Sequence, residues 1–225
     1  DEDVRQAIHQ ENRQREALKR LYEVMRLDPV PVMGMDLLNV LYGSKYRLDK
    51  EQAAEELNCL RERILEDYHA NPKKEKKPRI LVTGCPIGGD TQKVVRAIED
   101  NGGVVVAFEN CTGAKVLDKL VDEEDPDIYG AIARKYFYIG CAIMTPNDNR
   151  IELLGRMIDE FRVDGVVEMI LSGCHSVHME SISVRNFVGE EKHIPYIDVV
   201  TDYSPGDVGQ LNTRMSAFIE MLETH

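Results

Sequence analysis

The sequence predicts an α/β fold in which four or more parallel strands form a flavodoxin- or Rossmann-like sheet, preceded by a small helical segment. Four short apolar runs, rich in Val, Ile and Leu and bounded by glycine or polar residues, are typical of buried parallel strands. Helix-length segments separate these runs, as crossovers between parallel strands require. The predicted strands are Arg79–Thr83, Val104–Phe108, Gly165–Leu171 and Tyr196–Val200.

A change in composition divides the chain into a helical segment at residues 1–70, a linker at 71–78 and an α/β domain at 79–225. The linker contains a short basic run at residues 73–77, which we interpret as a solvated segment. In the helical segment, apolar residues recur at helical spacing among charged residues. The predicted helices run from Asp1 to about Arg26, where Pro29 and Pro31 end the pattern, from Gly34 to Tyr42, and from Lys50 to about Tyr68 with Asp49 as N-cap.

Further helices are expected between the strands and after the last of them. They run from an Asp90 cap to about Asn101, over Ala114–Val121, from Asp125-Pro126 to about Phe137, from Asn147 to Phe161, over about Glu180–Val188 and from Gly209 to Leu222. A strand order of 2-1-3-4 would place the first and third strands side by side. In such a sheet, ligands bind at the switch point between those two strands.

Composition restricts the class of protein. The chain has 225 residues, of which 43% are hydrophobic and 30% are charged, as is typical of a globular protein in water. No apolar run approaches the ~18 residues that span a bilayer, so no membrane partner is expected. The net charge of −12 argues against nucleic acid. Five cysteines without an export signal or a CxxC pair indicate a reducing, cytoplasmic setting.

Three cysteines directly follow predicted strands: Cys85 the first, Cys111 the second and Cys174 the third. Because parallel strands end at one edge of their sheet, we expect these thiols to converge there. Taken singly, each is more typical of a small buried hydrophobic residue. Taken together, they favour a metal or iron–sulfur site, since thiolates are the usual cluster ligands. Cys141 follows a predicted helix and is a further candidate for the same edge.

Residues beside these cysteines suggest supporting roles. Gly113 and Gly173 would let the backbone approach a bulky inorganic group. His175 and His178 are candidates for donating hydrogen bonds to a cluster sulfur or for transferring protons, although solvated or helix-capping histidines are equally consistent with the pattern. Glu180 is a weakly supported acid–base candidate.

Two alternative interpretations remain. The glycine-rich turn at residues 83–90 could cradle a phosphate, but it matches neither dinucleotide-binding nor P-loop spacing, and a simple tight turn explains it as well. Cys174 and His175 could form a nucleophile pair, but adjacent residues rarely point their side chains at each other.

The chain resembles the carboxy-terminal part of the 2-hydroxyacyl-CoA dehydratase / benzoyl-CoA reductase family of iron–sulfur subunits. The resemblance covers nearly the whole chain, and the sequence around Cys111 and Cys174 is most similar to the double-cubane-cluster branch. The motifs that carry it lie at residues 79–86 (RILVTGCP), 108–113 (FENCTG), 164–167 (DGVV), 173–176 (GCHS) and 210–222 (QLNTRMSAFIEML).

The resemblance implies α/β domains around a [4Fe-4S] or double-cubane cluster, pairing as a homodimer or heterodimer, and an ATP-hydrolysing iron–sulfur activator that injects a low-potential electron. Cys174 matches the later cluster ligand. The two other usual ligands lie in an amino-terminal domain that this sequence, which starts at Asp1, is expected to lack. Many dehydratases have Phe-Cys-Asp-Pro where this chain has Gly173-Cys174-His175-Ser176, which weakens the case for dehydration and leaves reduction open.

Three hypotheses follow. The first is an iron–sulfur redox subunit, or its carboxy-terminal half, that acts on an acyl-CoA or another small substrate, with Cys174 as a cluster ligand and Cys111 and Cys85 as ligands or pocket residues. The second is a non-catalytic α/β subunit that packs on a cluster-bearing chain. The third is a cysteine-dependent enzyme without a metal.

Overall fold

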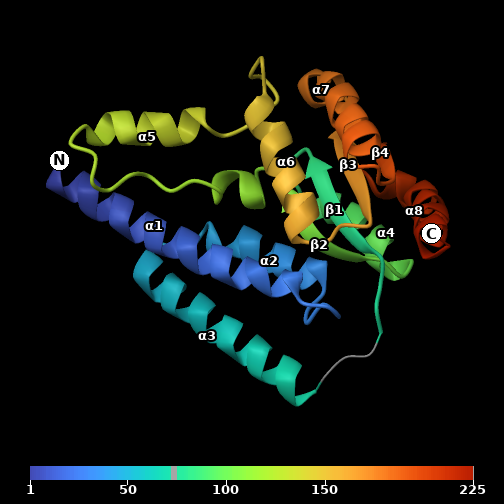
Figure 1. The fold of residues 1–225 in the computed structure, drawn as a ribbon, viewed down its shortest axis with the longest axis horizontal. Helices are drawn as coiled ribbons and strands as arrows, with labels where there is room; N and C mark the ends of the chain where they lie inside the picture. Colours follow the sequence, from blue (N-terminus) through green and yellow to red (C-terminus); the bar gives the residue numbers. More distant parts are fainter. Residues whose placement is uncertain (72–74, 225) are drawn as a thin grey trace.

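A four-stranded, all-parallel sheet in the order β2-β1-β3-β4 organises the molecule, as Figure 1 shows. The structure is a computed structural model that describes residues 1–71 and 75–224. The strands are β1 (Arg79–Gly84), β2 (Val104–Glu109), β3 (Gly165–Leu171) and β4 (Tyr196–Thr201). The predicted fold class and the predicted strand order are both confirmed, and the switch point lies between β1 and β3.

The register of the sheet aligns polar residues near the carboxyl ends of the central strands. Thr83 of β1 pairs with Glu109 of β2 on one side and with Glu168 of β3 on the other. All the residues of β1 and β2 are buried, so this polar row lies inside the protein rather than at a solvated edge. A buried charge of this kind requires a partner.

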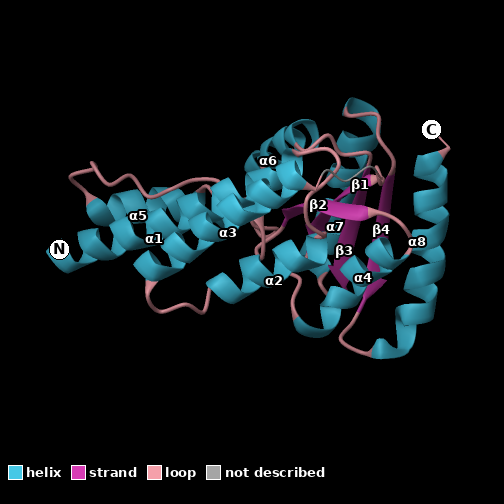
Figure 2. Ribbon diagram, turned by 90° about the horizontal axis from the view of Figure 1, so that it is seen from below, coloured by secondary structure: helices cyan, strands magenta, loops and turns pink. Residues whose placement is uncertain are grey.

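Helices cover both faces of the sheet, as expected for parallel strands. Helices α4 (Lys93–Asp100) and α8 (Val208–Glu223) pack against each other, and Figure 2 shows them side by side. Helices α6 (Asp148–Glu160) and α7 (His175–Asn186) are the crossover helices that lead into β3 and β4. Because both crossovers run in the opposite direction to the β1–α4–β2 crossover, right-handedness places them on the opposite face.

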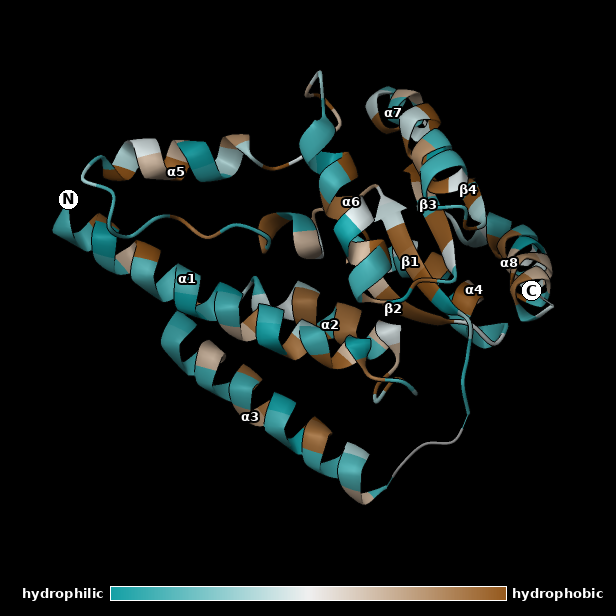
Figure 3. Cartoon of the chain, viewed as in Figure 1, coloured by the Kyte–Doolittle hydropathy of each residue, from teal (hydrophilic) through white to brown (hydrophobic). Residues whose placement is uncertain are grey.

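The amino-terminal helices pack onto this α/β unit and share its core. They are α1 (Glu2–Tyr22), continued by a 3-10 turn at Glu23–Arg26, α2 (Gly34–Ser44) and α3 (Lys50–Ala70). Leu21 of α1 and Leu38 of α2 belong to the same hydrophobic cluster as Ile80 of β1. Figure 3 shows mainly hydrophilic residues along the outward side of α1 and α3. The division into segments at 1–70, 71–78 and 79–225 stays a prediction, and linker residues 72–74 lie outside the described residues.

Arg79, the first residue of β1, ties the helical segment to the sheet. Its buried guanidinium donates hydrogen bonds to the carbonyl oxygens of Met25 (2.6 Å), Leu27 (3.1 Å) and Phe161 (2.8 Å). The ring of Tyr22 lies 5.1 Å from that of Phe161, centroid to centroid, and the Tyr22 hydroxyl accepts from the Phe108 amide. Polar and aromatic contacts therefore hold the end of α1 against the start of β1 and the side of β2.

Most predicted helices are present, with shifted ends. The Asp49 N-cap is confirmed, because its carboxylate accepts from the Gln52 amide at 2.9 Å. The predicted Asp90 cap is wrong: Gly88 and Thr91 form a 3-10 turn at Gly89–Gln92, and α4 starts only at Lys93. Ala114–Val121 contains only a 3-10 turn at Ala114–Val116. Helix α5 runs from Ile128 to Phe137 with Asp127 as its cap, and α7 starts at His175 rather than near Glu180.

Candidate functional site

The switch point between β1 and β3 brings two thiols together. Cys85, which follows β1, is buried, and its backbone N–H donates to the Met169 carbonyl at 2.8 Å. Cys174, half-buried at the start of α7, donates its backbone N–H to the Leu171 carbonyl at 2.9 Å, and its thiol lies near enough to Cys85 to raise the pKa of the Cys85 thiol. The backbone N–H of Leu171 donates to Cys85 Sγ at 3.3 Å. Two residues 89 positions apart thus form a thiol pair, Cys85 and Cys174, where the parallel topology predicts a ligand site.

Burial controls the protonation of the inner thiol. Desolvation, which is the largest cause, together with the neighbouring Cys174 and Glu168, raises the pKa of Cys85 to about 11, while the Leu171 N–H acts in the opposite direction. Cys85 is therefore a protonated thiol at neutral pH when no ligand is present. A metal bound there would have to displace the proton, which makes metal affinity depend on pH.

Two glycines shape the turns that carry the thiol pair. Gly84 has a φ of +98°, and a Cβ there would lie 2.2 Å from the Met169 carbonyl oxygen, so a side chain would break the contact between β1 and β3. Gly173 has a φ of +84°, and a Cβ there would meet nothing within 4 Å. The space beside Gly173 is therefore open next to Cys174.

Cys111 lies at the end of the neighbouring strand, β2, and has a different environment. It is half-buried, and its carbonyl accepts a hydrogen bond from Lys45 Nζ at 2.5 Å. Gly113 packs on its own strand, because a Cβ there would lie 2.2 Å from the Phe108 carbonyl oxygen. The Asn110 side chain holds this turn together by accepting from the Thr112 amide at 3.0 Å and from the Gly113 amide at 3.1 Å.

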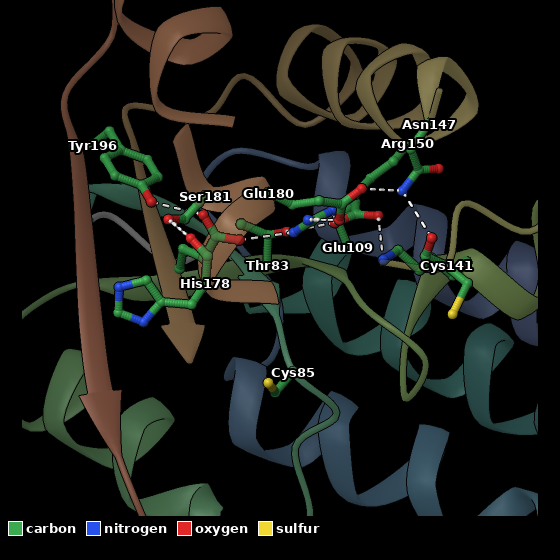
Figure 4. A network of polar contacts seen from close by, with 12 residues as sticks. Thr83, Cys85, Glu109, Cys141, Asn147, Arg150, His178, Glu180, Ser181 and Tyr196 are labelled. Atoms are coloured by element: carbon green, nitrogen blue, oxygen red, sulfur yellow. Dashed lines mark hydrogen bonds and ion pairs between the residues drawn. The ribbon is translucent and has the colours of Figure 1, made fainter. Parts of the chain in front are cut away.

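The other two cysteines lie apart from the thiol pair. Cys141 is half-buried between α5 and α6, its carbonyl accepts from Asn147 Nδ2 at 3.0 Å, and Figure 4 shows it well separated from Cys85. Cys59 is exposed on α3. Within residues 1–71 and 75–224, no group of three or more His, Cys, Asp or Glu side chains is placed to hold a metal ion.

The two histidines occupy the first turn of α7. His175 and His178 are both exposed, and the His178 backbone N–H donates to the Cys174 carbonyl at 3.1 Å. In Figure 4 the His178 ring lies away from Arg150 and its carboxylate partners. Helix α7 thus places both imidazoles in solvent, close in sequence to the outer thiol.

A buried ion network lies behind the thiol pair, and the sequence analysis did not predict it. Arg150 of α6 donates to Glu168 at 2.8 Å, to Glu180 at 2.5 Å and to the Thr83 hydroxyl at 3.1 Å, and its Nε lies 3.5 Å from Glu109. Figure 4 shows the side chains of Thr83, Glu109 and Glu180 converging on Arg150 from strands and helices. Glu180, the predicted acid–base group, is therefore a partner of Arg150, and it also accepts from Asn147.

Burial and the opposite charges act against each other on the pKa values of this network. Burial alone would lower the pKa of Arg150, but the carboxylates of Glu109, Glu168 and Glu180 outweigh that effect and raise it. Burial raises the pKa of Glu168, against the opposing charge of Arg150. Burial also raises the pKa of Tyr196, whose hydroxyl donates to Glu168 at 2.7 Å. Arg150 is a permanent cation that joins the polar row of the sheet to α6 and α7.

A sequence signal for this network did exist. Glu168 interrupts the apolar run of β3, and Glu109 ends that of β2. A carboxylate inside a fully buried strand requires a buried cation. The sequence does not show which arginine or lysine of α6, α7 or the connecting loops pairs with these carboxylates, because packing decides it. In the structure the partners are Arg150 and Lys115, which lies 3.4 Å from Glu109.

The fold and its thiol pair define an α/β protein with a cysteine-lined strand edge at a topological switch point. The chain belongs to the family of the 2-hydroxyglutaryl-CoA dehydratase D-component, whose family model matches residues 1–222. That family comprises the dehydratase or reductase component of 2-hydroxyacyl-CoA dehydratase-like systems.

Three curated proteins are similar to the chain. A putative dehydratase subunit, YjiM, of Escherichia coli (strain K12) is 48% identical over 219 residues, covering 97% of this chain and 57% of the relative. A benzoyl-CoA reductase subunit of Thauera aromatica is 23% identical over 67% of this chain and 35% of the relative. The alpha subunit of lactoyl-CoA dehydratase of Anaerotignum propionicum is 20% identical over 92% of this chain and 49% of the relative.

The chain therefore spans between about a third and just over half of the length of these relatives. Among its described residues, no helix is both long enough and apolar enough to cross a membrane.

Proposed function

We propose that the chain is part of an iron–sulfur redox subunit in a low-potential, activator-dependent reductase or dehydratase that acts on an acyl-CoA or another small substrate. The observation that carries the proposal is the thiol pair, Cys85 and Cys174, at the switch point of the sheet. Membership of the family and the activities of two relatives, benzoyl-CoA reductase and lactoyl-CoA dehydratase, support the substrate class.

The donors at the thiol pair fit a cluster in part. Cys85 and Cys174 offer two sulfur ligands, the Leu171 N–H already points at Cys85 Sγ, and the backbone at Gly173 leaves open space. An N–H donor of this kind stabilises a thiolate and tunes a cluster's potential. A four-iron cluster usually takes four thiolates, so further ligands are needed.

Cys111 is the proposed third ligand, because it follows the strand next to β1. The residue before it, Asn110, has a buried Nδ2 without a hydrogen-bond acceptor, which is a spare donor for an anionic group. Cys141 lies in a loop at the Asn147 end of the ion network, apart from Cys85, and is the least supported of the predicted ligands. We propose that the remaining ligands come from a related subunit or from a segment beyond these 225 residues.

When bound, a [4Fe-4S] or double-cubane cluster would supply single electrons at low potential. The chain's own residues would hold it through sulfur and exclude water on the Cys85 side. His175 and His178, exposed beside Cys174, are the proposed proton carriers, and Glu180 positions α7 through Arg150 rather than exchanging protons. The proposed setting is cytoplasmic, in a homodimer or heterodimer served by an ATP-hydrolysing iron–sulfur activator.

The test is iron and acid-labile sulfide analysis, with electron paramagnetic resonance, on protein purified without oxygen. We expect iron with matching sulfide, lost in Cys174→Ser and in Cys85→Ser. Cys59→Ser is the matched control, because Cys59 is exposed on α3 and should leave the iron content unchanged. Iron that survives in both the Cys85 and Cys174 variants would refute the assignment of ligands.

A second candidate is a non-catalytic subunit that packs on a cluster-bearing chain. It is favoured by the lack, within the described part of the chain, of a group of three side chains placed for a metal. Co-expression with a related subunit separates the two candidates. If iron appears only in the complex and is lost in Cys174→Ser, this chain contributes ligands. If the iron content of the complex is the same with and without Cys174→Ser, the chain is only a packing partner.

A further inference from the structure

A basic cleft lies on the helical side of the molecule. We use this name for the hollow of about 270 Å³ between α1, the end of α2, the start of α3, α5 and the loop that follows β2. Among the described residues that line it, four are cationic and one, Glu11, is a carboxylate. A local excess of positive charge is unexpected in a chain whose net charge is −12. The four cationic residues are Arg15, Lys45, Lys50 and Lys135.

The single carboxylate does not neutralise these cations. Glu11 lies 3.3 Å from Lys50 and 3.7 Å from Arg15. Within the described ranges, neither Lys45 nor Lys135 has a carboxylate at ion-pairing distance. Lys45 instead donates to the Cys111 carbonyl, and Lys135 Nζ lies 3.2 Å from the Val116 carbonyl. Two ammonium groups thus face the basic cleft with carbonyl oxygens as their hydrogen-bond acceptors.

One of these ammonium groups is deeply buried. Lys135 is 5% exposed, and its Nζ lies 4.4 Å above the ring of Tyr136. Burial and, to a smaller extent, the charge of Arg15 lower the pKa of Lys135 to about 8. Keeping unpaired cations in such a place costs free energy, which an anion in the cleft would offset.

The geometry of the basic cleft therefore points to a ligand, and we propose that it binds a phosphate group, either free or carried by a small phosphate ester. Lysines bind phosphate as point charges, and arginine adds donors in a fixed fork. The Tyr136 hydroxyl also lines the cleft and is a donor suited to a phosphate oxygen, whereas the hydroxyls of Ser44 and Thr112 donate to the carbonyls of Leu41 and Ile87. The cleft is a bounded hollow rather than an extended groove, which favours a small anion over a polymer. The site does not depend on a cluster being present at the thiol pair.

The test is isothermal titration calorimetry of the 225-residue chain with inorganic phosphate, pyrophosphate and adenosine 3′,5′-bisphosphate. We expect saturable binding that weakens at least about tenfold in Lys135→Met, since a hydrogen bond to a charged group contributes on the order of one to two factors of ten. The matched control is Lys119→Met, because Lys119 also lies over a tyrosine ring, Tyr138, at 4.8 Å, but does not line the cleft.

A second variant, at the exposed Lys45, distinguishes a loss of phosphate binding from misfolding of Lys135→Met. Lys45 is exposed at the rim, so Lys45→Met should fold normally and still weaken binding about tenfold. Equal affinity for phosphate and for the bisphosphate would mean that the phosphate alone is recognised; tighter binding of the bisphosphate would identify a nucleotide ester as the natural source. No saturable binding at millimolar concentration of any probe, or equal binding by the Lys45, Lys135 and Lys119 variants, would overturn the proposal.

Discussion

At the scale of single residues, Arg150 has the largest structural role, because its guanidinium pairs with three carboxylates, on β2, β3 and α7, and of these Glu109 also has Lys115 at 3.4 Å. Each of those carboxylates lies in or beside the sheet core, where an ionised group without a partner is strongly disfavoured. Arg150 therefore holds α6 and α7 to the strand ends that carry the thiol pair.

Replacing Arg150 by Met should lower the free energy of unfolding by roughly 3–5 kcal/mol, because it leaves buried carboxylates unpaired. Urea denaturation followed by circular dichroism measures this change. Arg156→Met is the control: Arg156 lies on the same helix, but its pair with Asp118, at 2.8 Å, is on the surface, so its loss should cost less than about 1 kcal/mol. Equal costs for the two variants would contradict the assigned role of the network.

The thiols should differ in reactivity when no cluster is bound. With its pKa raised to about 11, Cys85 has roughly one thiolate in a thousand at pH 8, and the thiolate is the form that reacts. Iodoacetamide should therefore modify the exposed Cys59 and the half-buried Cys174 before Cys85, as peptide mass spectrometry can show. Labelling of Cys85 should increase as pH rises toward 11; labelling of Cys85 as fast as Cys59 at pH 8 would refute its buried, protonated state.

The candidate site was predictable from sequence only where backbone topology decides it. Cys85 and Cys174 were placed together because any parallel sheet in the order 2-1-3-4 brings those two strand ends side by side. The acid–base role of Glu180 stays a prediction, and sequence spacing does not reveal that Arg150, 30 positions earlier, pairs with its carboxylate. Side-chain pairing across helices depends on packing angles that no local pattern contains.

At the scale of elements, the start of α2 shows how closely helix and sheet approach. A Cβ at Gly34 would lie 2.3 Å from the Val105 carbonyl oxygen of β2, while the Gly34 amide donates to Glu99 at 2.7 Å. Gly43, near the other end of the same helix, would place a Cβ in open space. The two glycines of α2 thus have different physical reasons to be there.

Gly34→Ala should destabilise the protein by about 1–3 kcal/mol, because the added methyl group overpacks the contact between α2 and β2. Gly43→Ala should be neutral or stabilising by up to about 1 kcal/mol, since alanine is the better helix former. Thermal unfolding of both variants, compared with the unmodified chain, measures the difference. A stabilising effect at Gly34 would mean that α2 packs less closely than described.

Elements were predicted well where the apolar period is strong. The four predicted strands agree with the structure to within one residue at each end, since strands of a parallel sheet are rich in aliphatic and β-branched residues even where Glu168 interrupts β3 and Asp198 interrupts β4. Turns were predicted less well than strands. The Thr91 hydroxyl accepts from the Gly88 amide at 3.0 Å and stabilises a 3-10 turn, which takes the place of the helix start expected at Asp90. The irregular stretch after Val116 is held by tertiary contacts, since Asn12 of α1 donates to the Val121 carbonyl at 2.7 Å.

At the scale of the whole molecule, helices α1, α2, α3 and α5 and the loop after β2 together form the basic cleft. The protonation of its lysines therefore depends on how these elements pack together. The groups facing Lys135 are Arg15 and Glu11 of α1, Lys45 after α2, Lys50 of α3 and Tyr136 of α5. Phosphate raises the pKa of a lysine that it contacts, because an opposite charge favours the protonated form.

Phosphate affinity should therefore depend on pH through Lys135. Since its pKa in the free protein is lowered to about 8, the ammonium is present at pH 7 and is lost progressively as pH rises above 8. The ratio of affinities between the unmodified chain and Lys135→Met should be at least about tenfold at pH 7 and should shrink toward unity near pH 10. Calorimetry at three pH values tests this; a constant ratio would exclude Lys135 as the titrating group.

The hydrogen bonds of Arg79 to Met25 and Leu27 have a consequence for chain connectivity. Because a shared core and these buried contacts join α1 and α2 to the sheet, the covalent link through residues 71–78 is not what keeps the two parts together. Two separate polypeptides, 1–76 and 77–225, should reassemble into a complementing pair that co-elutes and unfolds in one transition. Arg79→Met should weaken that pair far more than it affects the intact chain, in which the effective concentration of the two parts is high.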